Sequence, residues 1–127
     1  MKRIETNDVI YEIKDGILFC SYKENLVLDV TVARRIVSDR LLFTEGQEYL
    51  ILIDFNNLKS ANKEAREYMN AFDGGLKGLI GGAFVSDKIA VSVFINLYLK
   101  IDKPKIPTKF FSQHNEALTW LKSLTTV

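Results

Sequence analysis

The fold is decided by the stretch Tyr49-Leu50-Ile51-Leu52-Ile53-Asp54-Phe55, which is almost continuously apolar. Strands that are buried on only one face alternate apolar and polar residues, whereas a strand buried on both faces is apolar throughout. This stretch therefore predicts a buried strand, and the rest of the chain is interpreted outward from it.

Two β-rich runs and one helix are predicted before this strand. Residues 4–13 and 16–22 are rich in Ile, Val, Tyr and Phe, and an Asp-Gly pair between them is typical of a hairpin turn. A helix then extends to about residue 44, because apolar residues recur on one of its faces and Asp29 or Thr31 can cap its start.

Helices and strands alternate after the central strand. In order, we predict a helix over 61–72 with Ser60 as its N-cap, a strand over 79–85, a helix over 89–101 capped by Ser86 or Asp87, a strand over 109–111, and a closing helix capped by Ser112. The polar residues Lys88, Ser92, Asn96 and Lys100 are spaced by four, which favours a helix over a strand in that segment. The element order ββαβαβαβα predicts an α/β fold with one mixed five-stranded sheet and about four helices.

Length and composition restrict the class of protein. With 127 residues, 47% hydrophobic and 26% charged, the chain has the size and balance of one globular domain over 1–127. A net charge of +1 gives no reason to expect nucleic acid or an anionic membrane as partner. No apolar run reaches the roughly 18 residues of a membrane span. The single cysteine, Cys20, cannot form an internal disulfide, and a buried thiol in a cytoplasmic protein is expected.

Several segments together resemble the SpoIIAA-like family, a bacterial branch of the STAS-type fold that is also described as STAS/SEC14-like. They are Asp15-Gly16-Ile17-Leu18, the strand Tyr49–Asp54, Lys109-Phe110-Phe111 and Glu116-Ala117-Leu118-Thr119-Trp120-Leu121. The resemblance implies a small cytoplasmic domain that binds a partner and catalyses no known reaction.

The chain departs from this family at the residue that regulates it. Regulated members carry an Asp-Ser-Ser-Gly-like motif at the start of the helix after the third strand, and one serine is phosphorylated. Here that stretch is Asn62-Lys63-Glu64-Ala65, so Lys63 and Glu64 stand where the serines would be. Ser60 is a neighbour and not the equivalent residue. The resemblance therefore implies a protein without the usual phosphoserine switch.

Polar residues follow the predicted strands at the carboxyl edge of the sheet, where open α/β sheets place their binding sites. The candidate ligand or partner residues are Asp54, Asn56, Asn57, Ser60, Ser86 and Asp87. They form no recognisable catalytic or metal-binding motif, so we expect no enzyme activity, metal or cofactor. Asp54 is expected to bond loop amides, and the only histidine, His114, to face solvent at the start of the closing helix.

The helix over 89–101 has more apolar surface than packing on a sheet requires. Ala90, Phe94, Tyr98 and Ile101 are predicted to face the sheet, which leaves the ridge Val91, Ile95 and Leu99 for a contact between two copies of the chain or for cover by a neighbouring helix. Two functions follow. The first is a non-enzymatic regulatory module that acts through protein–protein contact, including a homodimer. The second is a SEC14-like carrier or sensor of an apolar small molecule.

Overall fold

A computed structural model describes residues 2–125 of the protein. In chain order the elements are β1 (Lys2–Glu5), β2 (Val9–Lys14), β3 (Ile17–Tyr22), β4 (Leu26–Leu28), α1 (Val30–Phe43), β5 (Tyr49–Asp54), β6 (Leu58–Ala61), α2 (Lys63–Met69), β7 (Leu79–Val85), α3 (Ile89–Asp102), β8 (Thr108–Phe111) and α4 (His114–Ser123).

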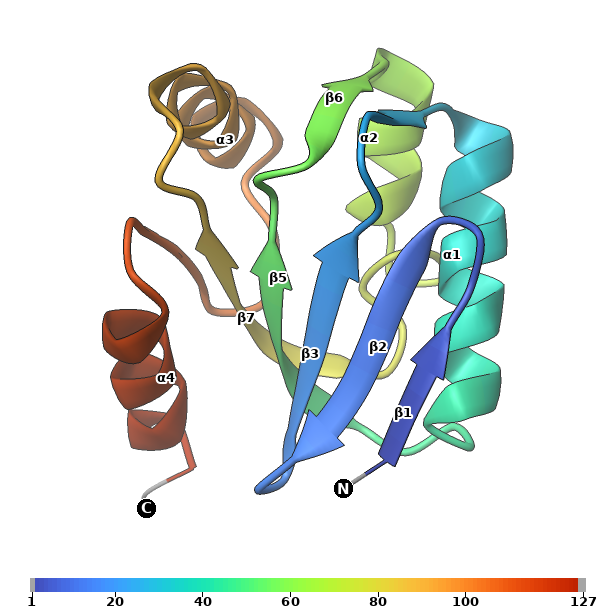
Figure 1. The fold of residues 1–127 in the computed structure, drawn as a ribbon, viewed down its shortest axis with the longest axis vertical. Coiled ribbons are helices and arrows are strands. Elements are labelled where there is room, and N and C mark those ends of the chain that lie inside the picture. Colours follow the sequence, from blue (N-terminus) through green and yellow to red (C-terminus); the bar gives the residue numbers. More distant parts are fainter. Residues whose placement is uncertain (1, 126–127) are drawn as a thin grey trace.

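The main sheet has six strands in the order β1-β2-β3-β5-β7-β8, so the apolar run Tyr49–Asp54 lies near its middle as predicted. The pairs β1/β2 and β2/β3 are antiparallel, and β3/β5, β5/β7 and β7/β8 are parallel. Helices α1, α2 and α3 lie over one face of this sheet and α4 over the other (Figure 1).

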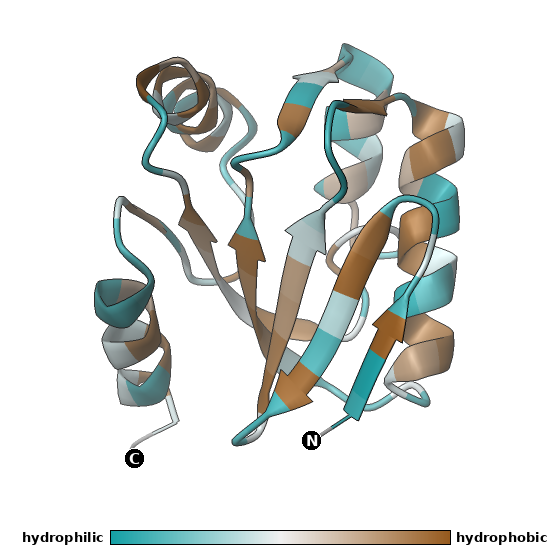
Figure 2. Ribbon diagram, in the orientation of Figure 1, coloured by the Kyte–Doolittle hydropathy of each residue, from teal (hydrophilic) through white to brown (hydrophobic). Residues whose placement is uncertain are grey.

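Each face of the sheet has its own apolar core. On β5, Ile51 and Ile53 belong to the core beneath α1–α3, while Leu50 and Leu52 pack with α4. Both sets of alternating residues are covered, which explains why the strand is apolar throughout. In Figure 2, β5 is drawn mainly in brown. The α/β class and the mixed sheet with four helices are confirmed. The strand number is corrected from five to six in the main sheet, with a second sheet of two short strands.

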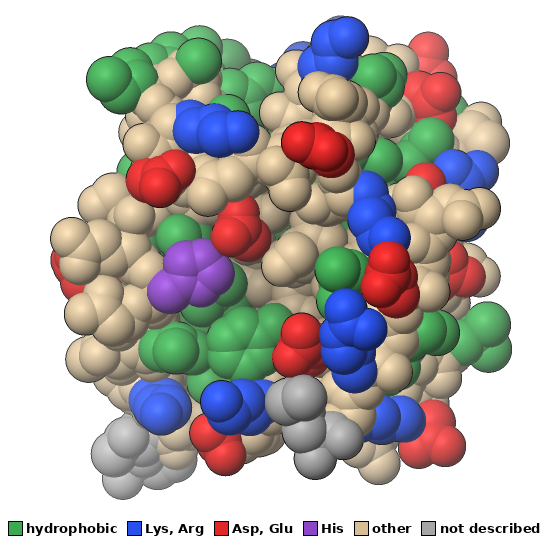
Figure 3. Space-filling model, viewed as in Figure 1, with side chains coloured by type: hydrophobic (Ala, Val, Ile, Leu, Met, Phe, Trp, Pro, Cys, Tyr) green, Lys and Arg blue, Asp and Glu red, His purple; other side chains and the backbone are tan. Residues whose placement is uncertain are grey.

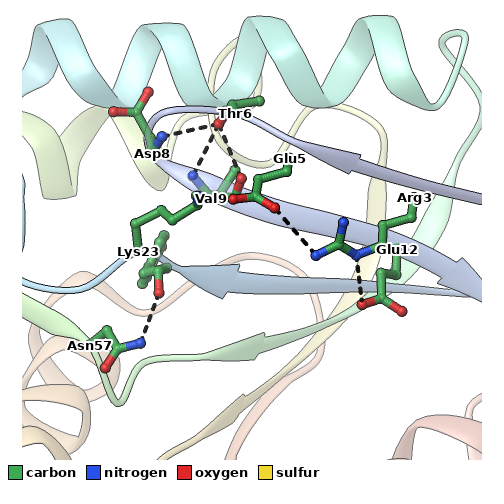
Figure 4. Close-up of polar contacts among 9 residues, drawn as sticks. Arg3, Glu5, Thr6, Asp8, Val9, Glu12, Lys23 and Asn57 are labelled. Atoms are coloured by element: carbon green, nitrogen blue, oxygen red, sulfur yellow. Dashed lines mark hydrogen bonds and ion pairs between the residues drawn. The ribbon is translucent and has the colours of Figure 1, made fainter.

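The first β-rich run, predicted as one strand over 4–13, is two strands joined by a turn. The hydroxyl of Thr6 accepts hydrogen bonds from the backbone N–H groups of Asp8 (3.1 Å) and Val9 (3.0 Å), as Figure 4 shows. A threonine side chain that bonds the backbone in this way competes with a continuous strand. The chain therefore reverses at Thr6 and β1 pairs with β2.

The second correction concerns Ser60. It lies exposed on β6, which pairs in parallel with β4, and it does not cap α2. The N-cap is Asn62, whose side-chain oxygen accepts from the backbone N–H of Ala65 at 2.9 Å. As a result α2 is shorter than the predicted 61–72, and Phe72, at the end of the predicted helix, is 67% exposed.

We expect Asn62→Ala to lower the free energy of unfolding by about 1 kcal/mol, because the N–H of Ala65 would lose its acceptor. Ser60→Ala should change it by less than about 0.5 kcal/mol, since Ser60 is an exposed residue without a capping contact. Urea denaturation of the two variants beside wild type measures this difference. Equal losses at both positions would contradict the assignment of the cap.

The caps predicted for α3 and α4 are also corrected. Lys88 and Gln113 occupy the N-cap positions, and neither makes a capping hydrogen bond with its side chain. Ser86 and Asp87 lie before the cap of α3, where their groups bond Asn56 instead. Ser112 lies one residue before the cap of α4. In both places the helix starts one or two residues later than predicted.

Candidate functional site

The carboxyl ends of β5 and β7 carry a cluster of polar side chains, as predicted. Asn56 joins the two strand ends: its side-chain oxygen accepts from the Ser86 hydroxyl at 2.7 Å and from the Asp87 backbone N–H at 3.2 Å. The Lys88 ammonium donates to the backbone carbonyl of Asn56 at 2.7 Å. The structure thus brings Asn56, Ser86 and Asp87 together, with Lys88 as a member that the sequence did not indicate.

Asp54 closes β5 and makes two contacts. One carboxylate oxygen accepts from the Asn56 backbone N–H at 2.8 Å, which is the loop-amide role expected from the sequence. The other lies 3.1 Å from Nε2 of His114. The two residues are 60 positions apart, and no contact between them was predicted. The contact could have been predicted, because a helix that follows a parallel strand starts at the carboxyl edge of the sheet, where β5 also ends.

Two predicted members lie outside this cluster. The Asn57 side chain donates to the backbone carbonyl of Tyr22 at 3.1 Å and so fastens the end of β3 to the loop after β5 (Figure 4). Ser60 is exposed on β6. Their positions follow from the short pairing of β4 with β6, which carries the chain away from the sheet edge directly after Asp54.

The nucleophilic side chains of this part of the molecule are already engaged or buried. The Ser86 hydroxyl donates to Asn56 and accepts from the Lys88 backbone N–H at 3.1 Å. Burial raises the pKa of Cys20 to about 12, so its thiol stays protonated at neutral pH. Within residues 2–125, no three His, Cys, Asp or Glu side chains are grouped so that they could hold a metal ion.

A mainly apolar cavity of about 60 Å³ lies between the sheet face and helices α2 and α3. Apolar side chains from β5, α2 and α3 line it, among them Ile53, Met69 and Phe94. The lining also includes the polar residues Tyr22, Arg40, Arg66, Tyr98 and Thr108, although its exposed surface is almost entirely apolar. A cavity this small is well below the 300–1,000 Å³ of typical drug-sized ligand sites, so it suits only a small molecule.

The outward surface of α3 is apolar, but the ridge differs from the predicted one. Ile95 is 1% exposed and belongs to the core, and Val91 and Leu99 are partly buried against it. The exposed ridge consists of Ile89 (82%), Val93 (56%), Leu97 (53%) and Ile101 (65%), which we call the α3 ridge. The candidate contact at Val91, Ile95 and Leu99 is therefore corrected, because the neighbouring core covers it. Figure 3 shows hydrophobic side chains gathered over this end of the molecule.

A family model, described as a domain of unknown function (DUF7793), matches residues 11–125 of the chain. The protein belongs to the DUF7793 family. A search among curated proteins found no match for this DUF7793 chain.

Among solved structures, the DUF7793 chain is similar to an uncharacterized protein of the DUF3478 family from Shewanella loihica PV-4, described as having a SpoIIAA-like fold. The TM-score is 0.59 at 16% sequence identity, and the alignment covers 93% of this chain and 98% of the other. At this identity the likeness is one of fold, and it confirms the SpoIIAA-like architecture inferred from the sequence. Among the described residues of the DUF7793 chain, no helix is long and apolar enough to cross a membrane.

Proposed function

We propose that this protein is a non-enzymatic binding module that acts through protein–protein contact, with the α3 ridge as its contact surface. The observation that carries the proposal is the exposure of four apolar side chains spaced by four along one helix: Ile89, Val93, Leu97 and Ile101. Single exposed apolar residues are ordinary, but a continuous ridge of them is typical of an interaction site.

The occupant that fits this ridge best is a second copy of the chain. In an antiparallel two-fold pairing, Val93 of one copy would meet Leu97 of the other, and the apolar residues would face each other along the helices. Asp87, just before α3, would then lie opposite Lys103, just after it, at both ends of the contact. Both side chains are exposed in the single chain, so this pairing supplies complementary charges at the rim.

The length of α3 limits the strength of such a contact. Fourteen residues of helix span about 21 Å, which gives each copy less contact area than the roughly 800 Å² of a standard interface. We therefore expect a dissociation constant in the micromolar range, which corresponds to a binding free energy of about −8 kcal/mol. A contact of this strength suits a regulatory protein that exchanges partners.

Two observations support a function without catalysis. The Ser86 hydroxyl, at the sheet edge, is occupied by its hydrogen bond to Asn56. The Cys20 thiol, in the core, is kept protonated by burial. The imidazole of His114 contacts Asp54, but no serine or cysteine of the described residues bonds to it, so the arrangement lacks the nucleophile of a catalytic triad.

The start of α2 supports regulation by a means other than a phosphoserine. Asn62 caps the helix, and the next two residues are Lys63 and Glu64 rather than serines. Ser60, the nearest hydroxyl, lies on β6 before the cap. A cytoplasmic, bacterial protein remains the expectation from the SpoIIAA-like resemblance.

Sedimentation velocity at about 10–100 µM tests the contact, because this range brackets the expected micromolar dissociation constant. We expect wild type to form a dimer and Leu97→Glu to be a folded monomer, since a two-fold contact would bury two unpaired carboxylates. Leu42→Glu is the matched control, because Leu42 is 76% exposed on α1 and lies outside the ridge. A wild type that stays monomeric throughout this range would contradict the proposed pairing, as would a Leu97→Glu variant that remains dimeric.

The cavity beneath α2 and α3 favours a second candidate function, the binding of a small molecule. Its lining is mainly apolar and includes side chains from both helices, so a ligand there could alter the position of α3 and hence the ridge. This function is compatible with the first, because the cavity lies on the inner side of α3 and the ridge on its outer side.

A further inference from the structure

The strand β6 has an edge that no described strand covers. It forms a two-stranded sheet with β4, which is its only strand partner among residues 2–125. In the main sheet, β5 lies between β3 and β7. Along the chain β4 follows β3 and β6 follows β5, whereas the segment after β7 turns into α3 (Figure 1). A strand position is therefore vacant beside β6, on the side where β7 lies next to β5.

The backbone of β6 turns hydrogen-bonding groups toward this vacant position. On the opposite side, the carbonyl of Asn57 accepts from a backbone N–H of β4 at 3.2 Å, and the N–H of Asn62 donates to a carbonyl of β4 at 3.2 Å. Successive residues of a strand direct their backbone groups to alternate sides. The neighbours of these two residues, Leu58 and Ala61, therefore direct theirs away from β4. An uncovered edge of this kind can pair with another extended chain.

A groove of about 210 Å³ lies along this edge, between β6 and α3. Its lining residues are Leu58, Lys59 and Ser60 of β6 and Ala90, Val91 and Phe94 of α3. The groove opens to solvent, because Lys59, Ser60 and Ala90 are exposed. Its volume is below the roughly 300–1,000 Å³ of drug-sized ligand sites, so it suits the inward side chains of a segment that lies along its mouth.

The two faces of β6 differ in chemistry. Leu58 belongs to the core that α3 covers, and Lys59, the next residue of the strand, points to the opposite face and is exposed. The ammonium of Lys59 makes no ion pair or hydrogen bond with any residue from 2 to 125, and it is the one charged group of the groove lining. A strand added here would thus place alternate side chains against Val91 and Phe94, which are apolar, and the others near an unpaired positive charge.

We propose that this groove binds a short extended peptide of a partner protein, in which apolar and acidic residues alternate, as a further strand beside β6. In this mode of recognition main-chain hydrogen bonds supply the affinity, and contacts of alternate side chains supply the specificity. The inference goes beyond the pairing of the α3 ridge and does not depend on it, since no residue of the ridge lines the groove. The free edge of the main sheet at β1 is less suitable, because three of its four residues, Lys2, Arg3 and Glu5, are charged.

Titration of the ¹⁵N-labelled protein with the capped peptide acetyl-Val-Glu-Val-Glu-Val-amide, followed by NMR, tests the proposal. We expect saturable shifts of the amide signals of β6 and of the start of α3, and slower hydrogen exchange at the N–H of Ala61, because this group gains an acceptor. A peptide with the same side chains but with every backbone nitrogen methylated is the control, and it should not bind. Shifts confined to β1, an absence of saturable shifts, or equal binding of the methylated peptide would overturn the proposal.

Charge and steric variants locate the site. At about 0.15 M salt, which screens distant charges, Lys59→Glu should weaken peptide binding about three- to tenfold, because an attraction becomes a repulsion. Lys63→Glu is the matched control, since Lys63 is exposed at the start of α2 and lies outside the lining. Ala90→Trp should abolish binding, because an indole ring at this exposed position would fill the groove. Equal losses in the two lysine variants, or unchanged binding to Ala90→Trp, would overturn the assignment of the groove.

Discussion

Ile95→Glu is expected to unfold the protein. Ile95 is 1% exposed at the centre of α3, and it belongs to the core that α1, α2 and α3 form on the sheet. A glutamate there would place a carboxylate among apolar side chains without a partner, which costs several kcal/mol. Domains of this size have only about 5–15 kcal/mol of stability, so the substitution should remove most or all of it.

Circular dichroism and urea denaturation measure this effect. Leu97→Glu is the matched control, because it places the same charge two residues later, on the exposed side of α3, and should leave the fold intact. Ile95→Val is a milder substitution and should lower the free energy of unfolding by about 1 kcal/mol, because one buried methyl group is lost. A folded Ile95→Glu variant with nearly wild-type stability would contradict the orientation of α3.

Gly75→Ala is expected to be the second most damaging substitution. A Cβ atom at Gly75 would lie 2.1 Å from the backbone oxygen of Met69 and 2.3 Å from its Cα. Both are backbone atoms, so relief requires α2 and the following loop to move apart. Such a movement would also disturb the hydrogen bond from Arg40 to the Gly75 carbonyl. We expect a loss of about 3 kcal/mol in the free energy of unfolding.

Gly82→Ala is the control for this substitution. Gly82 is also buried, but a Cβ atom there would lie 3.4 Å from the nearest side-chain atom of Ile51, a distance that a small adjustment accommodates. We expect a loss of less than about 1 kcal/mol. If denaturation of the two variants gave equal losses, the close approach of Gly75 to α2 would be wrong.

The sequence predicted those elements whose apolar pattern is long and regular. The strand Tyr49–Asp54 and the helix Ile89–Asp102 are both present. The pairing of β4 with β6 was missed, because strands of three and four residues show no period and depend on a partner about 30 residues away. The misplacement of the α2 cap at Ser60 has the same origin, since the start of α2 depends on where β6 ends.

The orientation of α3 illustrates a second limit. The polar stripe that includes Ser92 and Asn96 correctly indicated a helix and the side that faces solvent. Apolar ridges flank this stripe on both sides, one through Ile95 and one through Val93. Which of them turns inward depends on where the sheet and α2 lie, and the sequence of the helix does not contain that information.

The candidate site was predicted in part. The carboxyl-edge rule correctly grouped Asn56, Ser86 and Asp87, because it depends only on the ends of parallel strands. The same rule, extended to helix starts, would have brought His114 to Asp54. The cavity polar groups Arg40, Tyr22 and Tyr98 come from α1, β3 and α3. Each follows the apolar period of its own element, so no local pattern marks them as a group.

Cysteine cross-linking across the α3 ridge tests whether two copies of the chain contact each other there. The antiparallel pairing predicts that a mixture of Val93→Cys and Leu97→Cys chains will form a mixed disulfide on mild oxidation, since these positions would face each other within the roughly 4–7 Å between Cα atoms that a disulfide spans. The native Cys20 is buried and should not compete. A mixture of Val93→Cys and Leu42→Cys serves as the control. A rapid mixed disulfide in the first mixture alone is expected, and equal, slow cross-linking in both mixtures would contradict the antiparallel pairing of two α3 helices.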